Sequence, residues 1–280
     1  MLPEVTGSLR CPVCAAALRA AGAALRCDAG HSFDLARQGY VNLLPGSSRP
    51  GAGDSPAMVT ARETFLGAGH FSGLADSVAA ECARAPVARQ SGLIVDLGAG
   101  TGYYLARALG RLPEWLGVAL DVSKHALRRA ARAHERLGAV ACDVWGALPV
   151  RETVADVVLS VFAPRNPSEI ARILRPDGRF VVVTPTVSHL AELVSALDLL
   201  SVDERKEERL EEQLGGAFAL MDKNEWERRL SLRHGDVEAL VGMGPSAFHQ
   251  DAGATRVRIS ELPEPVQVTA SVMLRTYRPA

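Results

Sequence analysis

The chain has 280 residues, 48% of them hydrophobic, and a formal net charge of −1. This length and composition suffice for one large or two smaller domains with a sizeable core, which excludes an intrinsically disordered chain. The near-zero charge excludes an overall basic field of the kind that attracts nucleic acids from all sides.

The cysteine content and the hydropathy pattern indicate the cellular compartment. Five cysteines do not form a disulfide framework, which favours a reducing environment. The N-terminus lacks a signal-peptide pattern, and no uncharged apolar run reaches the roughly 18 residues of a membrane span. We therefore expect a cytoplasmic protein that has no membrane partner.

The N-terminal segment carries a pattern of metal ligands. Two residues separate Cys11 from Cys14, and Cys27 and His31 follow after a short loop. Two close pairs of this kind can close a tetrahedral Cys₃His site for one Zn²⁺ ion. Because such a site has no open position for water, the predicted role of the zinc is structural. The alternative is a chance spacing of cysteines in a reduced protein.

The pattern of apolar residues divides the chain into three predicted parts. Residues 1–45 form a zinc-binding module, and residues 46–90 combine a linker rich in Pro, Gly and Ser with two helices. In residues 91–280, apolar runs alternate with helical patterns, which predicts a mostly parallel sheet with helices on both faces.

The elements of the third part can be placed in chain order. Residues 190–235 are predicted to be helical, and residues 256–259 and 266–277 to form a closing antiparallel pair. The predicted strands before them are 93–97, 114–120, 139–142, 154–162 and 179–184.

A glycine-rich turn follows the first of these strands. Asp96 precedes Gly98, Gly100 and Gly102, a spacing that differs from the G-x-G-x-x-G of nicotinamide-binding folds. A carboxylate at Asp96 would repel a pyrophosphate but attract the ammonium group of S-adenosylmethionine (SAM). The turn therefore favours SAM over NAD. It predicts an α/β, Rossmann-like fold of SAM-dependent methyltransferases with a mostly parallel seven-stranded sheet.

Acidic residues follow the second and third predicted strands. In open α/β sheets the ligand binds outside the carboxyl ends of the strands, so these residues should face the cofactor. Asp121 could accept hydrogen bonds from both ribose hydroxyls. Asp143 could accept one from the adenine amino group, although a helix cap would also explain its position.

The fourth and fifth strand ends carry candidate contacts to the methyl acceptor. Phe162 could stack on a planar base, and Pro164 offers a rigid apolar wall. His189 follows the fifth strand and faces the same crevice. Phe162 could equally be a core residue, and His189 an ordinary structural histidine.

Further motifs occur in a fixed order along the first two thirds of the chain. They are the four zinc ligands, residues 32–45, Gly53-Asp54-Ser55, Met58, Ala61-Arg62, Phe65-Leu66, 68–71, 96–104, 120–124 and Ala163-Pro164. In this order they resemble the RlmA family of 23S rRNA guanine-N1 methyltransferases, and in particular its Gram-positive, tylosin-resistance branch. The resemblance covers about residues 8–190.

The resemblance implies a substrate and several contacts. The expected reaction methylates guanine N1 in a 23S rRNA hairpin loop that lines the peptide exit tunnel, with resistance to tylosin-type macrolides as its outcome. Gly102, Tyr103 and His189 match positions that contact SAM. Phe71 stands where the family pattern often has tyrosine, so ring packing replaces a phenol contact there. The resemblance also suggests a homodimer.

The expected chemistry requires an accessible base and a proton acceptor. Guanine N1 lies on the Watson–Crick edge, so the target must be unpaired or flipped into the pocket. Asp143 and His189 are the candidates for the base that removes its proton. The zinc module would recognise the RNA, with Arg19, Arg26 and Arg37 binding phosphates.

Two other functions share much of this pattern. A small-molecule methyltransferase with a structural zinc module would use the same SAM residues, but its activity would not require RNA binding. A zinc-dependent RNA-binding protein without catalysis would not need the intact set of Asp96, Asp121 and the three glycines. RNA binding that weakens steeply with salt favours an RNA substrate over a small molecule.

Overall fold

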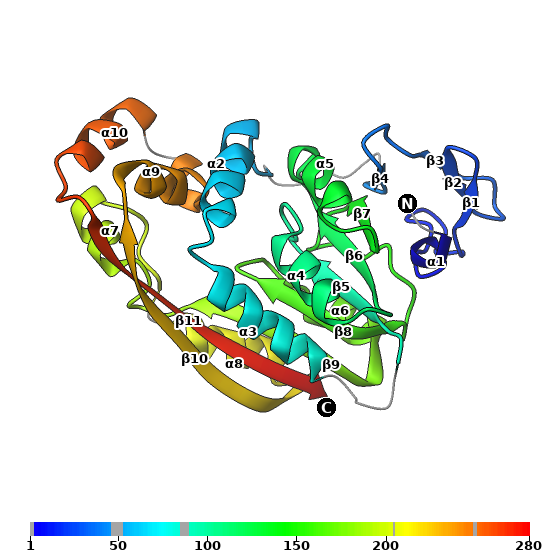
Figure 1. Cartoon of the computed structure of the whole chain (residues 1–280). Helices are drawn as coiled ribbons and strands as arrows, with labels where there is room; N and C mark the ends of the chain where they lie inside the picture. The colour runs from blue at the N-terminus through cyan, green and yellow to red at the C-terminus, as the bar shows by residue number, and fades with distance from the viewer. Residues whose placement is uncertain (1–2, 46–52, 85–89, 204, 249–250) are drawn as a thin grey trace.

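The structure is a computed structural model that describes residues 3–45, 53–84, 90–203, 205–248 and 251–280. Within these residues the strands form a small sheet of three strands and a large sheet of eight. The large sheet has the order β10-β11-β9-β8-β5-β6-β7-β4, and helices pack around it (Figure 1). This mostly parallel arrangement confirms the predicted Rossmann-like fold class.

The apolar runs that were predicted as strands form the centre of the large sheet. Most of their side chains are buried because apolar clusters cover both faces, as is usual for parallel strands. The observed bounds lie within a few residues of the predicted ones. They are β5 (Leu93–Leu97), β6 (Leu116–Asp121), β7 (Leu137–Ala141), β8 (Ala155–Val161) and β9 (Leu174–Pro185).

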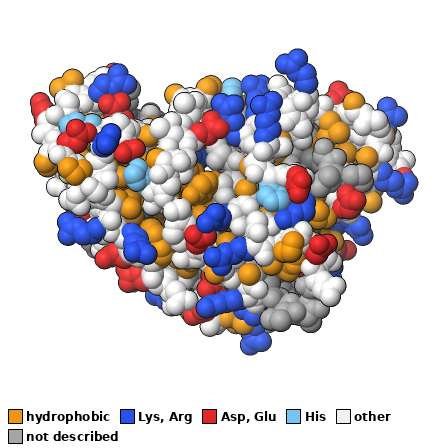
Figure 2. All heavy atoms as spheres, viewed as in Figure 1, with side chains coloured by type: hydrophobic (Ala, Val, Ile, Leu, Met, Phe, Trp, Pro, Cys, Tyr) orange, Lys and Arg blue, Asp and Glu red, His pale blue; other side chains and the backbone are white. Residues whose placement is uncertain are grey.

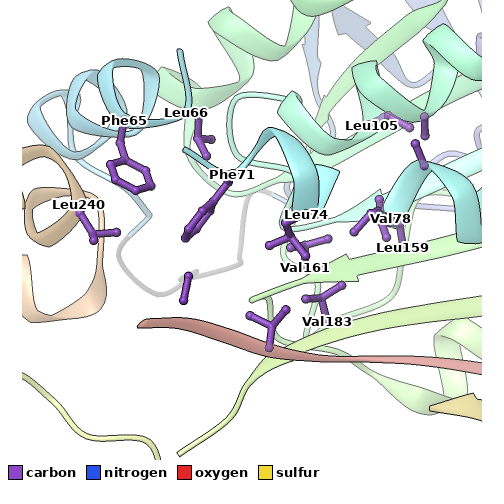
Figure 3. Packing of buried hydrophobic residues seen from close by; sticks show 14 of the residues in the cluster. Phe65, Leu66, Phe71, Leu74, Val78, Leu105, Leu159, Val161, Val183 and Leu240 are labelled. Atoms are coloured by element: carbon purple, nitrogen blue, oxygen red, sulfur yellow. The ribbon is translucent and has the colours of Figure 1, made fainter. Parts of the chain in front are cut away.

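One face of the sheet is covered by helices from both ends of the chain. Phe65 and Phe71 pack edge to face there, with ring centroids 5.0 Å apart, and Leu74 lies close to Val161 (Figure 3). These helices are α2 (Pro56–Gly67), α3 (Ser72–Ala83), α4 (Tyr103–Arg111), α5 (Lys124–Ala133), α7 (Ala191–Leu197) and α9 (His234–Gly242).

The opposite face carries the zinc module and two helices. Leu9, Leu18 and Leu25 of the module share one apolar cluster with the sheet. The same cluster includes residues of α6 (Pro167–Ile173) and α8 (Lys206–Leu214). The N-terminal module is therefore packed directly on the sheet.

The prediction of helix over residues 190–235 is correct for α7 and α8 but wrong for the last part. Residues Phe218–Leu232 form the strand β10, which pairs antiparallel with β11 (Val266–Pro279) over nearly its whole length. β10 lies at the edge of the sheet, where charged side chains protect an exposed strand. Its many charged residues do not give the apolar pattern of a strand, and pairing with β11 outweighs the local helix propensity.

The predicted strand at residues 256–259 is also wrong. These residues belong to α10 (Ala252–Ser260), which begins at the N-cap Asp251. The carboxylate of Asp251 accepts a hydrogen bond from the backbone N–H of Ala254 at 2.7 Å. A short β-branched run therefore lies in a capped helix, and the partner of β11 is β10 instead.

The zinc module contributes one strand to the large sheet. Its own sheet contains β1 (Arg19–Ala21), β2 (Ala24–Arg26) and β3 (Ser32–Asp34), after the short helix α1 (Pro3–Thr6). β4 (Tyr40–Asn42) then pairs in parallel with β7. The large sheet thus has eight strands where seven were predicted.

The zinc module and the group α9–η1–α10 lie at opposite ends of the molecule (Figure 1). η1 is a single turn at Pro245–Phe248, between α9 and α10. The predicted linker lies partly in residues 46–52, outside the described residues. No helix in the described part of the chain is long and apolar enough to cross a membrane.

Candidate zinc centre and active site

The four predicted metal ligands form one cluster. Nδ1 of His31 lies 3.4 Å from Sγ of Cys27 and 3.6 Å from Sγ of Cys11, and the sulfur atoms of Cys14 and Cys27 are 3.7 Å apart. All four ligand atoms lie within 4.8 Å of one another. Zinc bonds of about 2.0–2.3 Å in a tetrahedron give similar separations. The cluster therefore fits one structural Zn²⁺ ion.

The zinc module is attached to the rest of the chain beside this cluster. Leu9 and Val150 form a β-bridge, and Nε of Arg10 donates a hydrogen bond to the carbonyl oxygen of Leu148 at 3.1 Å. Nη2 of Arg10 lies 3.3 Å from a carboxylate oxygen of Glu169 in α6. These contacts fix the cluster relative to the sheet.

The glycine-rich turn after β5 is shaped by backbone conformation and by close packing. Gly98, Gly100 and Gly102 all have positive φ angles, which favour glycine. A Cβ atom on Gly98 would lie only 2.6 Å from Cβ of Ala163, at the carboxyl end of β8. The turn and the end of β8 are therefore in direct contact.

Two carboxylates stand at the ends of β5 and β6. Asp96 is buried, and burial together with the nearby Asp121 raises its pKa well above the ordinary value. Burial also raises the pKa of Asp121, although hydrogen bonds from the backbone oppose the shift. The carboxylate of Asp121 accepts from the N–H of Ser123 at 2.7 Å and of Gly100 at 2.8 Å. Asp121 thus stabilises the turn.

A small cavity of about 40 Å³ lies over the glycine-rich turn. Typical ligand pockets have volumes of about 300–1,000 Å³, so the cavity in this structure is smaller than a site for a ligand of the size of SAM. Arg62 of α2 is one wall and donates hydrogen bonds to Asp54 and to the carbonyl oxygen of Met243. Five predicted cofactor residues line the cavity: Phe71, Asp96, Gly98, Gly100 and Tyr103.

A second cavity of about 750 Å³ adjoins the first, because Arg62, Phe71, Phe162 and Met243 line both. It lies between α2, α7, α8, α9 and the carboxyl ends of β8 and β9. This cavity is large enough for a nucleobase.

Aromatic rings line the second cavity. The ring of His189 lies 5.8 Å from that of Phe162 and 6.4 Å from that of Phe71, measured between centroids. Phe162 has a positive φ angle of 54°, a strained conformation that is more frequent at functional sites. It is 39% exposed, so it is not a core residue. Pro164 does not line the cavity but lies near Gly98.

The two candidates for the catalytic base lie in different places. His189 lines the large cavity, and its Nδ1 accepts a hydrogen bond from the N–H of Ser271 at 3.2 Å. In neutral His189 the proton is then on Nε2, which can donate but not accept. Asp143 lines neither cavity. One of its oxygens accepts a hydrogen bond from the N–H of Trp145.

The predicted RNA-binding arginines differ in their surroundings. Arg19 forms an exposed ion pair with Asp28, and Arg26 donates to the hydroxyl of Ser32. Arg37 is exposed in the turn before β4, next to α5, where a Cβ on Gly39 would lie 3.5 Å from Ala131. The side chains of Lys and Arg gather over α5 in Figure 2. The turn that carries Arg37 thus lies beside the basic helix α5.

Sequence reasoning assigned no role to Arg62 and Arg165. Arg62 precedes the glycine-rich turn by a whole helix, so only the fold shows that it covers the turn. Arg165 lines the large cavity and follows Pro164 directly. Its position after the fourth predicted strand was the signal that could have found it.

Two family models match the chain. The zinc ribbon described as "RlmA, N-terminal" matches residues 9–49, and a methyltransferase domain model matches residues 94–178. Among solved structures, that of the MccD protein has a TM-score of 0.50 and 14% identity, and covers 73% of this chain and 96% of its own. At this identity it supports the fold alone.

Two curated relatives match over their full length. The 23S rRNA (guanine(748)-N(1))-methyltransferase of Streptomyces fradiae is 48% identical over 100% of this chain and 99% of its own. A protein of Micromonospora griseorubida, assigned as a 23S rRNA (guanine-N1)-methyltransferase, is 50% identical over the whole of both chains. By this similarity, the chain belongs to the family of SAM-dependent 23S rRNA (guanine-N1)-methyltransferases.

Proposed function

We propose that the protein transfers the methyl group of SAM to N1 of one guanine in 23S rRNA. The observation that carries the proposal is the contact between the glycine-rich turn and the end of β8, where Gly98 meets Ala163. This contact brings the small cavity next to the aromatic-lined large cavity. The full-length relative from Streptomyces fradiae is a methyltransferase of guanine N1 in 23S rRNA, and the relative from Micromonospora griseorubida is assigned the same activity, in agreement with such a pair of cavities.

In this proposal the small cavity holds the cofactor. The sulfonium of SAM supplies an activated methyl group, so the protein has only to align the reactants and assist loss of the proton. Asp96 attracts the ammonium group, and ionisation of this buried carboxylate is favoured once the cation is bound. The other proposed cofactor contacts that line this cavity are Gly98, Gly100, Phe71 and Tyr103. The remaining proposed contacts lie around it: His189 in the large cavity, and Gly102, Asp121 and Asp143 outside the lining of both.

The large cavity receives the target base in this proposal. Phe162 is exposed at its wall and offers a face for stacking. A guanine in a loop can enter without breaking base pairs, whereas a paired guanine must first be flipped out. The target that fits best is thus a guanine in a hairpin loop, and the relative from Streptomyces fradiae modifies guanine 748.

The zinc module and α5 hold the RNA outside the cavity. Arg37 and the basic side chains of α5 can contact phosphates on both sides of the target nucleotide. The zinc ion keeps the module in the shape that presents Arg37. A homodimer would extend this surface, and an rRNA substrate places the protein in the cytoplasm.

The biological role follows from the modified atom. A methyl group on guanine N1 removes a hydrogen-bond donor and adds bulk to the base. In a hairpin that lines the peptide exit tunnel, this would obstruct a tylosin-type macrolide. We therefore include macrolide resistance in the proposal.

The direct test is methylation of purified RNA. The protein is incubated with labelled SAM and unmodified 23S rRNA, and reverse-transcriptase stops are then mapped. A methyl group on N1 blocks base pairing, so incorporation of label with one new stop at a guanine supports the proposal. If neither naked rRNA nor ribosomal subunits accept label, the rRNA assignment is wrong and a small-molecule acceptor replaces it.

A further inference from the structure

The large cavity contains a cation without an acidic partner. Arg165 lines the cavity, and its Nε atom is buried without a hydrogen-bond partner. In the part of the chain that the structure describes, no carboxylate forms an ion pair with Arg165. A buried N–H without an acceptor is costly, so a ligand atom that accepts a hydrogen bond from Arg165 would be favoured in this cavity.

The surroundings of Arg165 do not neutralise it. Burial lowers the pKa of its guanidinium, and Arg275 lowers it further although Tyr277 acts in the opposite direction. An arginine nevertheless stays protonated in proteins. The site therefore offers a positive charge with directed N–H donors.

The backbone around Arg165 is held in place. Its carbonyl oxygen accepts a hydrogen bond from Nε2 of Gln213 in α8 at 3.3 Å. The next residue, Asn166, caps α6 and donates to the carbonyl oxygen of Trp145 at 2.8 Å. The backbone of Arg165 is thus fixed by α8, by α6 and by the segment at Trp145, as a preorganised site requires.

The described residues that line the cavity include no carboxylate that is free to remove a proton. Asp54 is paired with Arg62, and Asp203 with Arg209. His189 uses Nδ1 to accept from Ser271, so its neutral form has no acceptor nitrogen left. Among the described lining residues, the group without a partner is the guanidinium of Arg165, which is a hydrogen-bond donor and not a base.

We propose that Arg165 is a catalytic residue that donates a hydrogen bond to O6 of the target guanine. The proposal rests on the proposed function. When N1 loses its proton, the negative charge is shared between N1 and O6, and a guanidinium beside O6 stabilises that anion. The proton passes to water. The N1–CH₃ bond then forms while the S–CH₃ bond breaks and its electron pair remains on sulfur.

The position of Arg165 favours the base over a phosphate as its partner. Arg165 follows Phe162, the proposed stacking ring, by three residues on the same strand end. The lining around them is mostly apolar, which suits a neutral base better than an anionic phosphate. O6 is bonded to the carbon next to N1, so a donor that reaches O6 lies beside the reacting atom.

Single-turnover methylation of 23S rRNA tests the proposal with Arg165→Met and Arg165→Lys. With saturating RNA and SAM, we expect Arg165→Met to be slower by about 10²–10³-fold at neutral pH, as for loss of an oxyanion donor. Arg165→Lys keeps the charge but loses the paired N–H donors of the guanidinium, so its rate should lie between those of Arg165→Met and the wild type. Arg165 should lower the pKa of guanine N1 in the wild-type complex relative to the variant complex. Because guanine N1 ionises unaided at high pH, the rate deficit of Arg165→Met should shrink about tenfold for each pH unit between these two pKa values.

Matched measurements separate this role from others. Arg111→Met, at an exposed ion pair of α4, should retain the wild-type rate and pH profile. SAM affinity of Arg165→Met should match the wild type, and its unfolding midpoint should not fall, which shows that the variant is folded. If Arg165→Met raises only KM for RNA, or its deficit does not change with pH, Arg165 binds a phosphate and the proposal is wrong. An inactive wild type instead overturns the proposed function.

Discussion

Nη2 of Arg62 lies 2.8 Å from a carboxylate oxygen of Asp54, and the same atom donates to the carbonyl oxygen of Met243 at 3.0 Å. These contacts connect α2 to the segment before it and to the end of α9. Because Arg62 also lines both cavities, this ion pair is part of the cover over the proposed cofactor site. Under this proposal, the cover must move when SAM enters.

Replacement of Asp54 should therefore affect both stability and cofactor exchange. Both side chains of the pair are largely buried, so Asp54→Ala should lower the free energy of unfolding by about 1–3 kcal/mol in urea. SAM association, followed in a stopped-flow instrument, should become faster. Asp28→Ala removes the exposed pair with Arg19 and should cost less than about 1 kcal/mol. Equal losses in the two variants would contradict this assignment.

The glycine at the start of the turn should tolerate no side chain. Gly98→Ala would place Cβ at 2.6 Å from Ala163 in a backbone conformation with φ of 63°. We expect SAM binding, measured by calorimetry, to be lost, because either the turn or the end of β8 must shift. Gly110→Ala is the control, since no atom of the described residues lies within 4 Å of its Cβ position in α4. It should bind SAM normally and be slightly more stable. Normal SAM affinity in Gly98→Ala would refute the close-contact argument.

The sequence predicted the parts of the fold that depend on local patterns. Five central strands were found because each is an apolar run, and the glycine-rich turn was found from its spacing. β10 was missed because an edge strand does not need an apolar sequence, and its pairing with β11 is visible only in three dimensions. The hydrogen bonds of Arg62 and the unbonded Nε of Arg165 are also set by tertiary contacts, so the sequence alone could not predict them.

Asp96 should reduce the stability of the ligand-free protein at neutral pH. Its pKa is raised by burial and by Asp121, so the folded state holds a proton that the unfolded chain releases near pH 4. Stability should therefore fall as the pH rises from about 4 towards the folded pKa, and Asp96→Asn should remove this decline. Urea unfolding across this pH range measures it. Asp96→Asn should also weaken SAM binding, because the attraction for the ammonium group is lost.

A carboxylate with the opposite shift provides the control. The hydrogen bond from Arg107 lowers the pKa of Asp76 on the surface of α3. Asp76 therefore contributes stability that is present above the unfolded pKa and is lost as the pH falls through the folded one. Asp76→Asn should leave SAM affinity unchanged. If Asp96→Asn shows no gain in stability at neutral pH, the pKa of Asp96 is not raised in the ligand-free protein.

Loss of zinc should separate RNA modification from cofactor binding. Cys11→Ser removes one ligand, so the zinc content measured by atomic absorption should fall from one ion per chain. The module would lose its shape, and we expect rRNA methylation to drop by at least about tenfold, as after other losses of a metal site. Cys82→Ala, on the buried face of α3 and remote from the cluster, should keep its zinc.

The SAM affinity of Cys11→Ser distinguishes a role of the zinc module in RNA recognition from a role in stabilising the whole fold. The glycine-rich turn, Asp96 and Asp121 lie outside the module, so Cys11→Ser should retain part of its SAM affinity. The retention should be incomplete, because β4 pairs with β7 and Leu9 packs in the cluster beneath the sheet. If SAM affinity and methylation fall by the same factor, the module stabilises the whole fold and has no separate role in RNA recognition. A larger loss of methylation, with a smaller salt dependence of RNA binding, would assign phosphate contacts to the module.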